Sequence, residues 1–280
     1  MADEPLGPAA AAETGEAAGA GEEDAPAEGL QSLARGLAVV RALAAAGEPR
    51  TLAQVAQAAG LNRAVTRRVL LTLVEVGYVL ARGREFSLRP RVLELGQAYR
   101  SSLRLPALGE AAMAELVATT GQSCSMAVLD GDEIVYVQRV PGSRIIDAVI
   151  HVGTRLPAHA TAMGRVLLAA LDDTALEPAL GPGRLAGLTE RTVTDPDALR
   201  AELARVRERG YSLIEQEFER GLTTLAAPVR DAAGAVVAAV NLPLSSYTLP
   251  DGKVPEEYVD ALLATAQKIT DAAVATGLRS

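Results

Sequence analysis

Apolar residues repeat at helical spacing in two short segments between residues 51 and 76, and a turn separates the segments. Thr51 and Gln54 have the spacing of a capping box, in which a side-chain oxygen accepts the amide hydrogen three residues on. Gly60 supplies the positive-φ residue at which a helix stops, and Asn62 can cap a second helix directly afterwards. Two helices joined by so short a turn predict a helix-turn-helix whose second helix protrudes.

The second helix of this pair is expected to read DNA. Its buried stripe is predicted to consist of Val69, Leu70, Leu73 and Val76. Arginine side chains occupy other faces of its first two turns, and arginine pairs bidentately with guanine or contacts phosphates. The residues expected to contact DNA are Thr51, Asn62, Arg63, Ala64, Val65, Arg67 and Arg68. The plainer alternative is a basic, solvated face on a core helix.

Two flanking segments complete this domain, which is expected to span residues 30–90. Residues 30–47 predict a helix whose apolar face consists of Leu33, Leu37, Val40 and Leu43. Residues 78–88 predict a β-hairpin, because apolar residues on both arms surround a basic tip. A hairpin in this place is a wing, and Arg82 and Arg84 at its tip are well placed for phosphate or minor-groove contacts.

Beyond residue 90 the pattern changes to mixed helices and strands. Residues 91–105 predict a linker helix, and residues 106–280 predict an α+β domain. Within that domain an Asp-Gly turn at 130–132 marks a β-hairpin, and Asp195 before a proline starts a helix that stops at Gly210. The other expected helices lie at 107–119, up to about 171, and at 256–275, and the expected strands lie at 123–129, 134–140, 145–150, 211–218, 225–229 and 236–242. Such a domain has room for a small ligand.

The distribution of charge along the chain supports a nucleic-acid-binding module. The net charge of -8 is unfavourable for a DNA-binding protein taken as a whole. Residues 1–29 contain eight acidic residues and no basic ones, whereas residues 30–104 contain twelve arginines and four acidic residues. A basic module between acidic segments is the pattern expected of a DNA reader. The first 29 residues have too few large apolar side chains to fold, so we expect a disordered acidic tail.

Composition and motifs argue against several other classes of protein. A single cysteine, Cys124, excludes a disulfide framework within the chain, and two histidines with one cysteine do not form a zinc site of the usual spacing. Because the sequence has no signal peptide and no apolar run of membrane-spanning length, we expect a cytoplasmic protein with no membrane partner. No catalytic frame or phosphate loop is recognisable, so we expect no enzymatic activity, no cofactor and no bound metal.

Several segments together resemble the IclR family of bacterial transcription regulators, from about residue 30 to the C-terminus. The segments that carry the resemblance are Ser32-Leu33-Ala34-Arg35-Gly36-Leu37, the helix-turn-helix at 51–76, Gly77-Tyr78-Val79, Gly153-Thr154-Arg155-Leu156-Pro157 and Ala160-Thr161-Ala162-Met163-Gly164-Arg165. Residues 89–96 and 123–130 are similar to the branch that controls breakdown of protocatechuate, 4-hydroxybenzoate and related aromatic acids through the β-ketoadipate pathway.

The resemblance implies an N-terminal winged helix-turn-helix and a C-terminal GAF-like domain that binds a small organic acid. It also implies a homodimer or homotetramer on a pseudo-palindromic operator of double-stranded DNA. Carried over by position, the effector-binding residues are Leu156, Ala162, Met163, Glu217, Thr223, Thr224 and Asn241. Asn241 and Pro243 stand where serines are frequent in the family, which argues against simple glyoxylate-like effectors.

Plainer alternatives remain open for some of these positions. Glu217 alternates with Glu215 and Glu219, a pattern typical of an exposed acidic strip, and Met163 is equally compatible with a core position. His159 is expected to be a hydrogen-bonded structural residue. An anionic effector requires a cation or several donors, and the candidates are Arg139, Arg155 and Arg165.

The function that the sequence favours is an effector-responsive transcription regulator acting on catabolic genes. The alternative from another class is an enzyme that acts on a small organic acid, with the helical module serving only for dimerisation. A third is a non-specific nucleoid protein that binds random and operator DNA alike.

Overall fold

The structure is a computed structural model, and it describes residues 30–102, 104–143, 150–181, 183 and 185–279. The expected acidic tail and residues 145–149 of one expected strand lie outside the described residues. The chain divides into two compact units, Met1–Glu94 and Leu95–Ser280, and each is described by itself.

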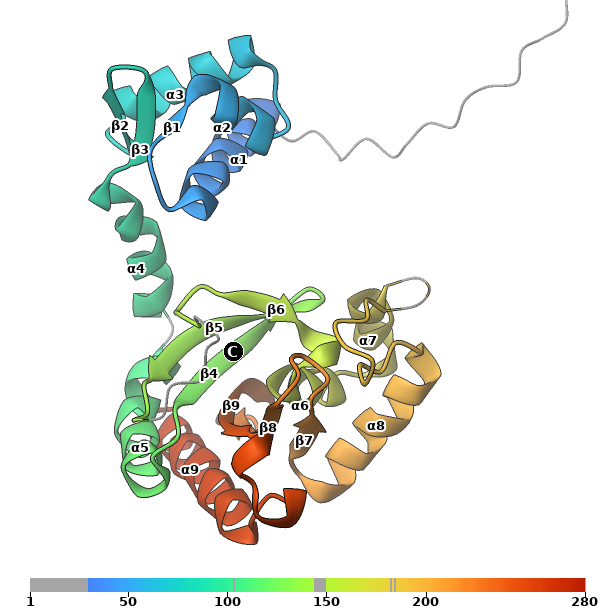
Figure 1. The fold of residues 1–280 in the computed structure, drawn as a ribbon. Helices are drawn as coiled ribbons and strands as arrows, with labels where there is room; N and C mark the ends of the chain where they lie inside the picture. The colour runs from blue at the N-terminus through green and yellow to red at the C-terminus, as the bar shows by residue number, and fades with distance from the viewer. Residues whose placement is uncertain (1–29, 103, 144–149, 182, 184, 280) are drawn as a thin grey trace, which may run out of the picture. The chain divides into compact units, whose positions relative to one another are not determined.

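The N-terminal unit is a three-helix domain with a small antiparallel sheet (Figure 1). Its helices are α1 (Gln31–Ala46), α2 (Leu52–Ala58) and α3 (Arg63–Glu75), and its strands are β1 (Arg50–Thr51), β2 (Val79–Arg82) and β3 (Glu85–Leu88). The strands are ordered β1-β3-β2, so that β2 and β3 form the expected hairpin. The core of this unit is built from Val39, Leu43, Val55, Leu70 and Val79. The winged helix-turn-helix expected from the sequence is confirmed.

Local capping signals set the bounds of the two helices of the helix-turn-helix. The Thr51 hydroxyl accepts from the Gln54 amide, and the Gln54 side chain accepts from the Thr51 amide at 2.9 Å, which completes the capping box. Gly60 has a φ of 64° and Asn62 accepts from the Val65 amide at 2.9 Å. The chain therefore turns and restarts a helix within four residues, as these residue types predict.

The predicted buried faces of two helices are partly wrong. Leu33 and Leu37 of α1 are 62% and 48% exposed, whereas Val39 is fully buried. The sequence of α1 carries two overlapping apolar stripes, and the core takes the one through Val39 and Leu43. At the end of α3, Val76 is 44% exposed, and Thr66 takes a buried place instead.

The C-terminal unit contains a six-stranded antiparallel sheet with helices on both faces. The sheet is ordered β6-β5-β4-β9-β8-β7, from β4 (Cys124–Asp130), β5 (Glu133–Val140), β6 (Arg155–Pro157), β7 (Ser212–Glu215), β8 (Leu222–Arg230) and β9 (Val236–Ser245). The helices are α5 (Arg104–Thr120), α6 (Ala162–Ala169), α7 (Asp173–Leu180), α8 (Pro196–Arg209) and α9 (Glu256–Ala275). Short 3₁₀ turns lie at Pro90–Val92, Ala158–Ala160, Ser246–Thr248 and Pro250–Gly252, and α4 (Leu93–Ser102) runs across the division between the units.

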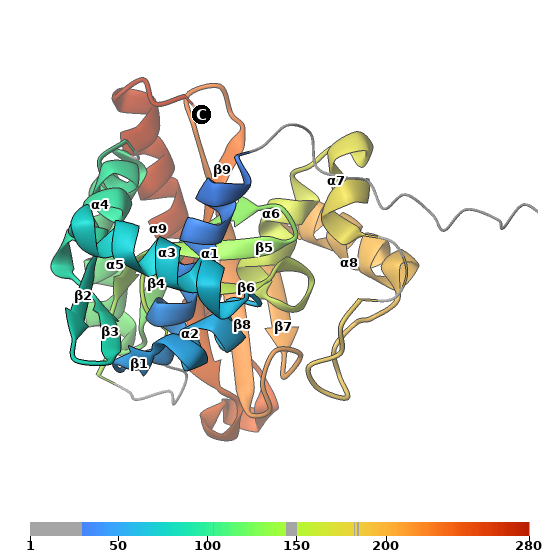
Figure 2. The same cartoon turned by 90° about the horizontal axis from the view of Figure 1, so that it is seen from above.

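Successive side chains of each strand point to opposite faces of this sheet, so apolar residues form two separate cores, one on each face. Helices α5 and α9 lie side by side on one face, and α6 lies on the other face with α8 packed against it (Figures 1 and 2). Met126, Leu225 and Val240 belong to the first core. Ala127 and Ala239, their neighbours in the strands, belong to the second core. The α+β expectation is confirmed, and a cavity described below adjoins the second core.

Residues that cap or end helices predicted the longer helices of this unit well, whereas short elements were missed. Asp195 caps α8, which stops at Gly210 with a φ of 79°, and α9 has the expected bounds. Helix α7 and the three-residue strand β6 were not expected. The expected strand at 211–218 is wrong in its second half, because Gln216 adopts a φ of 58° and ends β7. No helix within the described ranges is long and apolar enough to cross a membrane.

Candidate nucleic-acid interface and ligand cavity

The solvent-facing side of α3 carries unneutralised positive charge. Arg63, Arg67 and Arg68 are exposed, as is Ala64, whereas Val65 is half-buried. In the part of the chain that the structure describes, the side chains of these three arginines form no ion pair and no hydrogen bond. Three guanidinium groups on the first two turns of a protruding helix can therefore meet base edges or phosphates without first breaking an internal contact.

Two of the expected DNA contacts hold the backbone in place. The side-chain oxygens of Thr51 and Asn62 are occupied in capping α2 and α3. Asn62 thereby sets the start of α3, and Arg63 is the first residue of that helix.

The wing presents a second basic element in the same unit. Arg82 and Arg84 flank Gly83 at the tip between β2 and β3, and Gly83 has a φ of 59°. Both arginine side chains are exposed, and among the described residues neither has an ion-pair partner. A two-residue turn of this kind requires positive φ, so the glycine is needed for the hairpin and the arginines are not. Their charge is available for phosphates.

A cavity opens between the sheet and the start of α6 in the C-terminal unit. It holds about 570 Å³ of empty space, part of which is open solvent at its mouth. Its apolar lining residues are Ile150, Leu156, Ala162, Met163, Ile214, Phe218, Leu222 and Pro243, and its polar lining residues are Ser123, Ser125, Tyr136, Arg139, Thr161, Thr224 and Asn241. A mostly apolar hollow with a few polar groups is the usual form of a small-molecule site.

The α6 wall of the cavity is fixed by local geometry. Thr161 caps α6 by accepting from the Gly164 amide at 3.1 Å. A Cβ at Gly164 would collide with the backbone of Ala158, so only glycine lets the helix start this close to the preceding 3₁₀ turn. The fully buried Met163 then presents its side chain to the hollow.

Five of the seven effector-site residues expected from the sequence line this cavity, and two do not. Those that line it are Leu156, Ala162, Met163, Thr224 and Asn241. Thr223 is the neighbour of Thr224 in β8, and successive strand residues point to opposite faces. Its hydroxyl lies 2.8 Å from the Ser246 hydroxyl and is buried.

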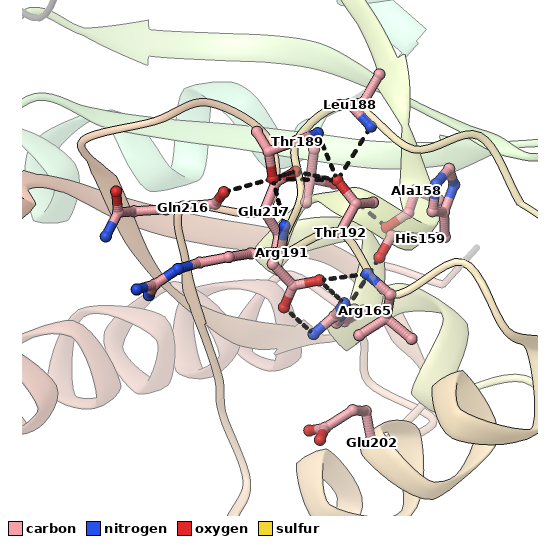
Figure 3. A network of polar contacts seen from close by, with 12 residues as sticks. Ala158, His159, Arg165, Leu188, Thr189, Arg191, Thr192, Glu202, Gln216 and Glu217 are labelled. Carbon is pink, nitrogen blue, oxygen red and sulfur yellow. Dashed lines mark hydrogen bonds and ion pairs between the residues drawn. The ribbon is translucent and has the colours of Figure 1, made fainter.

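Glu217 is the other residue that does not line the cavity. Its carboxylate forms a two-pronged ion pair with Arg165 of α6, with one contact at 2.8 Å, and both side chains are buried (Figure 3). It also accepts from the Val193 amide at 3.0 Å. The acidic strip considered for positions 215, 217 and 219 is wrong at the middle position, because the positive φ of Gln216 turns Glu217 inward.

This ion pair joins three segments behind the cavity wall. Arg165 donates from Nε to the His159 carbonyl at 3.0 Å, and the Thr192 hydroxyl donates to the Glu217 carbonyl at 2.6 Å (Figure 3). His159 is buried with Nε2 2.9 Å from the Ala186 carbonyl, which confirms its expected structural role. The network ties α6, the 185–194 segment and the loop that carries Phe218 into one rigid wall.

Burial raises the pKa of Tyr136 and Cys124, which both lie in strands of the sheet. Desolvation raises the pKa of the Tyr136 hydroxyl to about 12, and the positive charge of Arg139 partly offsets the rise. Tyr136 therefore stays protonated and can donate a hydrogen bond into the cavity. Desolvation also raises the pKa of the Cys124 thiol to about 12, and its side chain belongs to the core on the other face. The thiol is therefore held in its neutral form, which is the less nucleophilic one.

A winged helix-turn-helix with exposed arginines and a separate α+β domain with a cavity together define a two-domain DNA-binding regulator. The comparisons with known proteins agree with this class. Residues 32–83 match the IclR helix-turn-helix domain, and residues 97–271 match the C-terminal domain of the bacterial transcriptional regulator IclR. The chain belongs to the IclR family of bacterial transcriptional regulators.

Similar proteins place the chain with the regulators of aromatic-acid genes. It is 39% identical over 241 residues to the Pca regulon regulatory protein of Pseudomonas putida, covering 86% of this chain and 83% of that one. It is 36% identical over 217 residues to the p-hydroxybenzoate hydroxylase transcriptional activator of Acinetobacter baylyi, covering 76% and 80%. These relatives are named as regulators, so the regulator is favoured over the enzyme alternative.

Solved structures show the same fold. A Rhodococcus sp. RHA1 protein assigned as a transcriptional regulator superposes with a TM-score of 0.77 at 46% identity, covering 88% of this chain and 99% of that one. An IclR homologue from Microbacterium hydrocarbonoxydans, crystallised with 4-hydroxybenzoate, has a TM-score of 0.76 at 26% identity, covering 88% and 100%.

Proposed function

We propose that this regulator binds a pseudo-palindromic operator through α3 and the wing, and that a small organic acid in the C-terminal cavity controls the binding. The observation that carries the proposal is the set of exposed arginines on α3 and at the wing tip, without internal partners among the described residues. A basic module in an otherwise acidic chain has no structural need for these charges. In this proposal the protein acts in the cytoplasm, on the chromosome.

Each part of the basic surface has a distinct proposed task. Arg63 and Arg67 reach base edges in the major groove, and Arg68 contacts phosphate. Arg82 and Arg84 at the wing contact phosphates or the minor groove. Thr51 and Asn62 fix the helix starts, and Ala64 and Val65 contact the groove surface, where their small size lets α3 approach closely.

The proposed effector is an aromatic or dicarboxylic acid. The relatives named above regulate pca genes and the p-hydroxybenzoate hydroxylase gene, and one homologue binds 4-hydroxybenzoate. In this chain Leu156, Ala162, Met163, Thr224 and Asn241 would contact the acid. Bound acid would shift the protein between arrangements that are competent and incompetent for DNA, with residues 91–105 as the connection, because it binds the two with different affinity.

A homodimer, alone or paired into a homotetramer, would place two α3 helices in successive major grooves. An apolar stripe that the domain core does not use supports this assembly. Leu30, Leu33 and Leu37 lie on one side of α1 and are 76%, 62% and 48% exposed. Three large exposed leucines at helical spacing are typical of a helix that packs against a partner.

A charge placed on this stripe should weaken assembly and DNA binding together. The double variant Leu33→Glu, Leu37→Glu is expected to lower operator affinity on the order of 10-fold, because two half-sites are no longer bound as a unit. Sedimentation velocity and operator titration would measure both effects. Gln31→Glu, an exposed position of the same helix away from the stripe, serves as the control and should behave as wild type. Unchanged assembly in the double variant would exclude α1 from the interface.

Specific DNA binding is the first test of the proposed function. Purified protein would be titrated onto a fragment of its own upstream region and onto random DNA, at several salt concentrations. A regulator should bind the upstream fragment about 10³-fold or more tightly than random DNA, with affinity falling as salt rises. Equal affinity for both DNAs would support the nucleoid alternative instead.

A further inference from the structure

The cavity contains one cationic side chain among its described lining residues, and that side chain forms no ion pair with any other described residue. We propose that Arg139 binds the carboxylate of the effector and that the cavity selects an aromatic acid with a single carboxylate over a dicarboxylate. This inference rests on the proposed function, in which the cavity holds the effector.

Arg139 faces the cavity because of an irregularity in β5. Residues 136 and 139 are three apart, so in a regular strand their side chains would point to opposite faces. The pairing of β5 with β4 shifts between Met126 and Ala127, and Val137 has no partner there. This β-bulge restores Arg139 to the face that carries Tyr136, and both residues line the cavity.

The three cation candidates from the sequence differ in whether they are already neutralised. Arg155 is bound to Asp130 at 2.7 Å and to Glu133 at 2.6 Å on the protein surface. Arg165 is bound to Glu217 behind the cavity wall. Arg139 is half-buried and has no ion pair or hydrogen bond with any residue that the structure describes. A half-buried cation without a carboxylate partner is available for an anionic ligand.

Two further donors stand beside Arg139 in a row across the sheet. Arg139 is the pairing partner of Ser125 in β4, and Ser125 is the pairing partner of Asn241 in β9. The Asn241 side-chain oxygen accepts from the Ser125 amide at 2.9 Å, so its NH₂ group remains free to donate. The Ser125 hydroxyl has no hydrogen-bond partner among the described residues. A guanidinium, a hydroxyl and an amide in line match the acceptor oxygens of one carboxylate.

Among the described lining residues, none at the opposite end of the cavity carries a full positive charge. Thr224 lies on β8, with β4 and β9 between it and the strand of Arg139, and Ile214 and Phe218 are nearby lining residues. The start of α6 also lines the cavity, and a helix N-terminus supplies only about half an elementary charge. These groups suit the ring and the neutral hydroxyl of an aromatic acid. The second carboxylate of a dicarboxylate would be desolvated there without a cation, which disfavours its binding.

The test is isothermal titration calorimetry on the full chain with three probes: 4-hydroxybenzoate, its neutral analogue 4-hydroxybenzamide, and adipate. Wild type should bind 4-hydroxybenzoate at least about 10-fold more tightly than adipate. Arg139→Gln should weaken binding of 4-hydroxybenzoate by about 10- to 100-fold, because a charge-assisted contact is lost. Its affinity for 4-hydroxybenzamide should stay within about threefold of wild type, which shows an intact cavity.

Arg155→Gln is the matched control, because it removes a guanidinium from the same domain outside the cavity. It should bind all three probes as wild type does. The proposal is overturned if Arg139→Gln binds 4-hydroxybenzoate normally, if wild type binds adipate as tightly, or if wild type binds no probe. Titration of the same samples onto the upstream DNA distinguishes failure of this inference from failure of the proposed function. Specific DNA binding without the expected ligand pattern contradicts this inference alone, and absence of specific DNA binding contradicts the proposed function.

Discussion

Replacing Glu217 by alanine is expected to destabilise the C-terminal domain by about 3–5 kcal/mol. The variant leaves the Arg165 guanidinium buried without a counter-charge, and Arg165 is only 2% exposed. For a domain of this size, that loss lowers the unfolding temperature by roughly 6–20 °C. Differential scanning calorimetry of the full chain, with the two domain transitions separated, would measure it.

Two further variants test whether the effect comes from the buried charge. Glu190→Ala removes a carboxylate that also pairs with an arginine, but on the surface, where Glu190 and Arg220 are 65% and 73% exposed. This control should leave the transition unchanged. The double variant Glu217→Leu, Arg165→Met should recover much of the lost stability, since no charge then remains buried. A normal transition in Glu217→Ala would show that the ion pair does not hold the wall.

Replacing Arg63 or Arg67 by alanine is expected to weaken operator binding by about 1–3 kcal/mol each, if each pairs with a base. The effect should be larger on operator than on random DNA, so that specificity falls. Arg82→Ala or Arg84→Ala should weaken binding to operator and to random DNA by similar factors. Each should also reduce the slope of log affinity against log salt concentration by about one, because a phosphate contact is lost. Fluorescence polarisation with labelled DNA at several salt concentrations would separate the two patterns.

Arg220→Ala provides the control for loss of one positive charge, since Arg220 is exposed in the C-terminal domain. It should bind operator as wild type does. If neither Arg63→Ala nor Arg67→Ala changes operator affinity, α3 does not read the bases and the plainer alternative of a solvated basic face is correct.

Residues that act locally made most of the fold predictable. Thr51, Asn62 and Asp195 each cap a helix by a contact three residues away, and Gly60 and Gly210 end helices through their own φ angles. Because these contacts involve only a few neighbouring residues, helix starts and ends can be predicted from the local sequence. The bounds of the helices in the N-terminal domain and at the end of the chain were therefore predicted closely.

Features that depend on partners distant in sequence were not predictable in this way. The sequence of α1 offered two apolar stripes, and only packing against Val55 and Leu70 decides between them. The site residues show the same limit. Thr223 was assigned beside Thr224, although strand parity allows only one of the two to face the cavity. Regular alternation along β5 would place Arg139 on the face opposite Tyr136. A bulge in the pairing of β5 with β4 instead puts both side chains on the same face.

The burial of Glu217 could not be predicted for a further reason. An alternating run of glutamates indicates an exposed strip only while the strand continues, and a non-glycine residue at positive φ gives no sequence signal. The turn at Gln216 buries the charge, and Arg165, 52 positions earlier, neutralises it. Arg165 was a candidate for binding an anion, and the anion it binds is part of the protein.

We expect an acid bound in the C-terminal cavity to change the affinity of the protein for DNA. The most direct measurement is titration of the protein onto its labelled upstream fragment at fixed salt, with and without saturating 4-hydroxybenzoate. We expect operator affinity to change by about fivefold or more, and the affinity for the acid to change by the same factor when operator is bound. Specific operator binding that is identical with and without bound acid would contradict the claim.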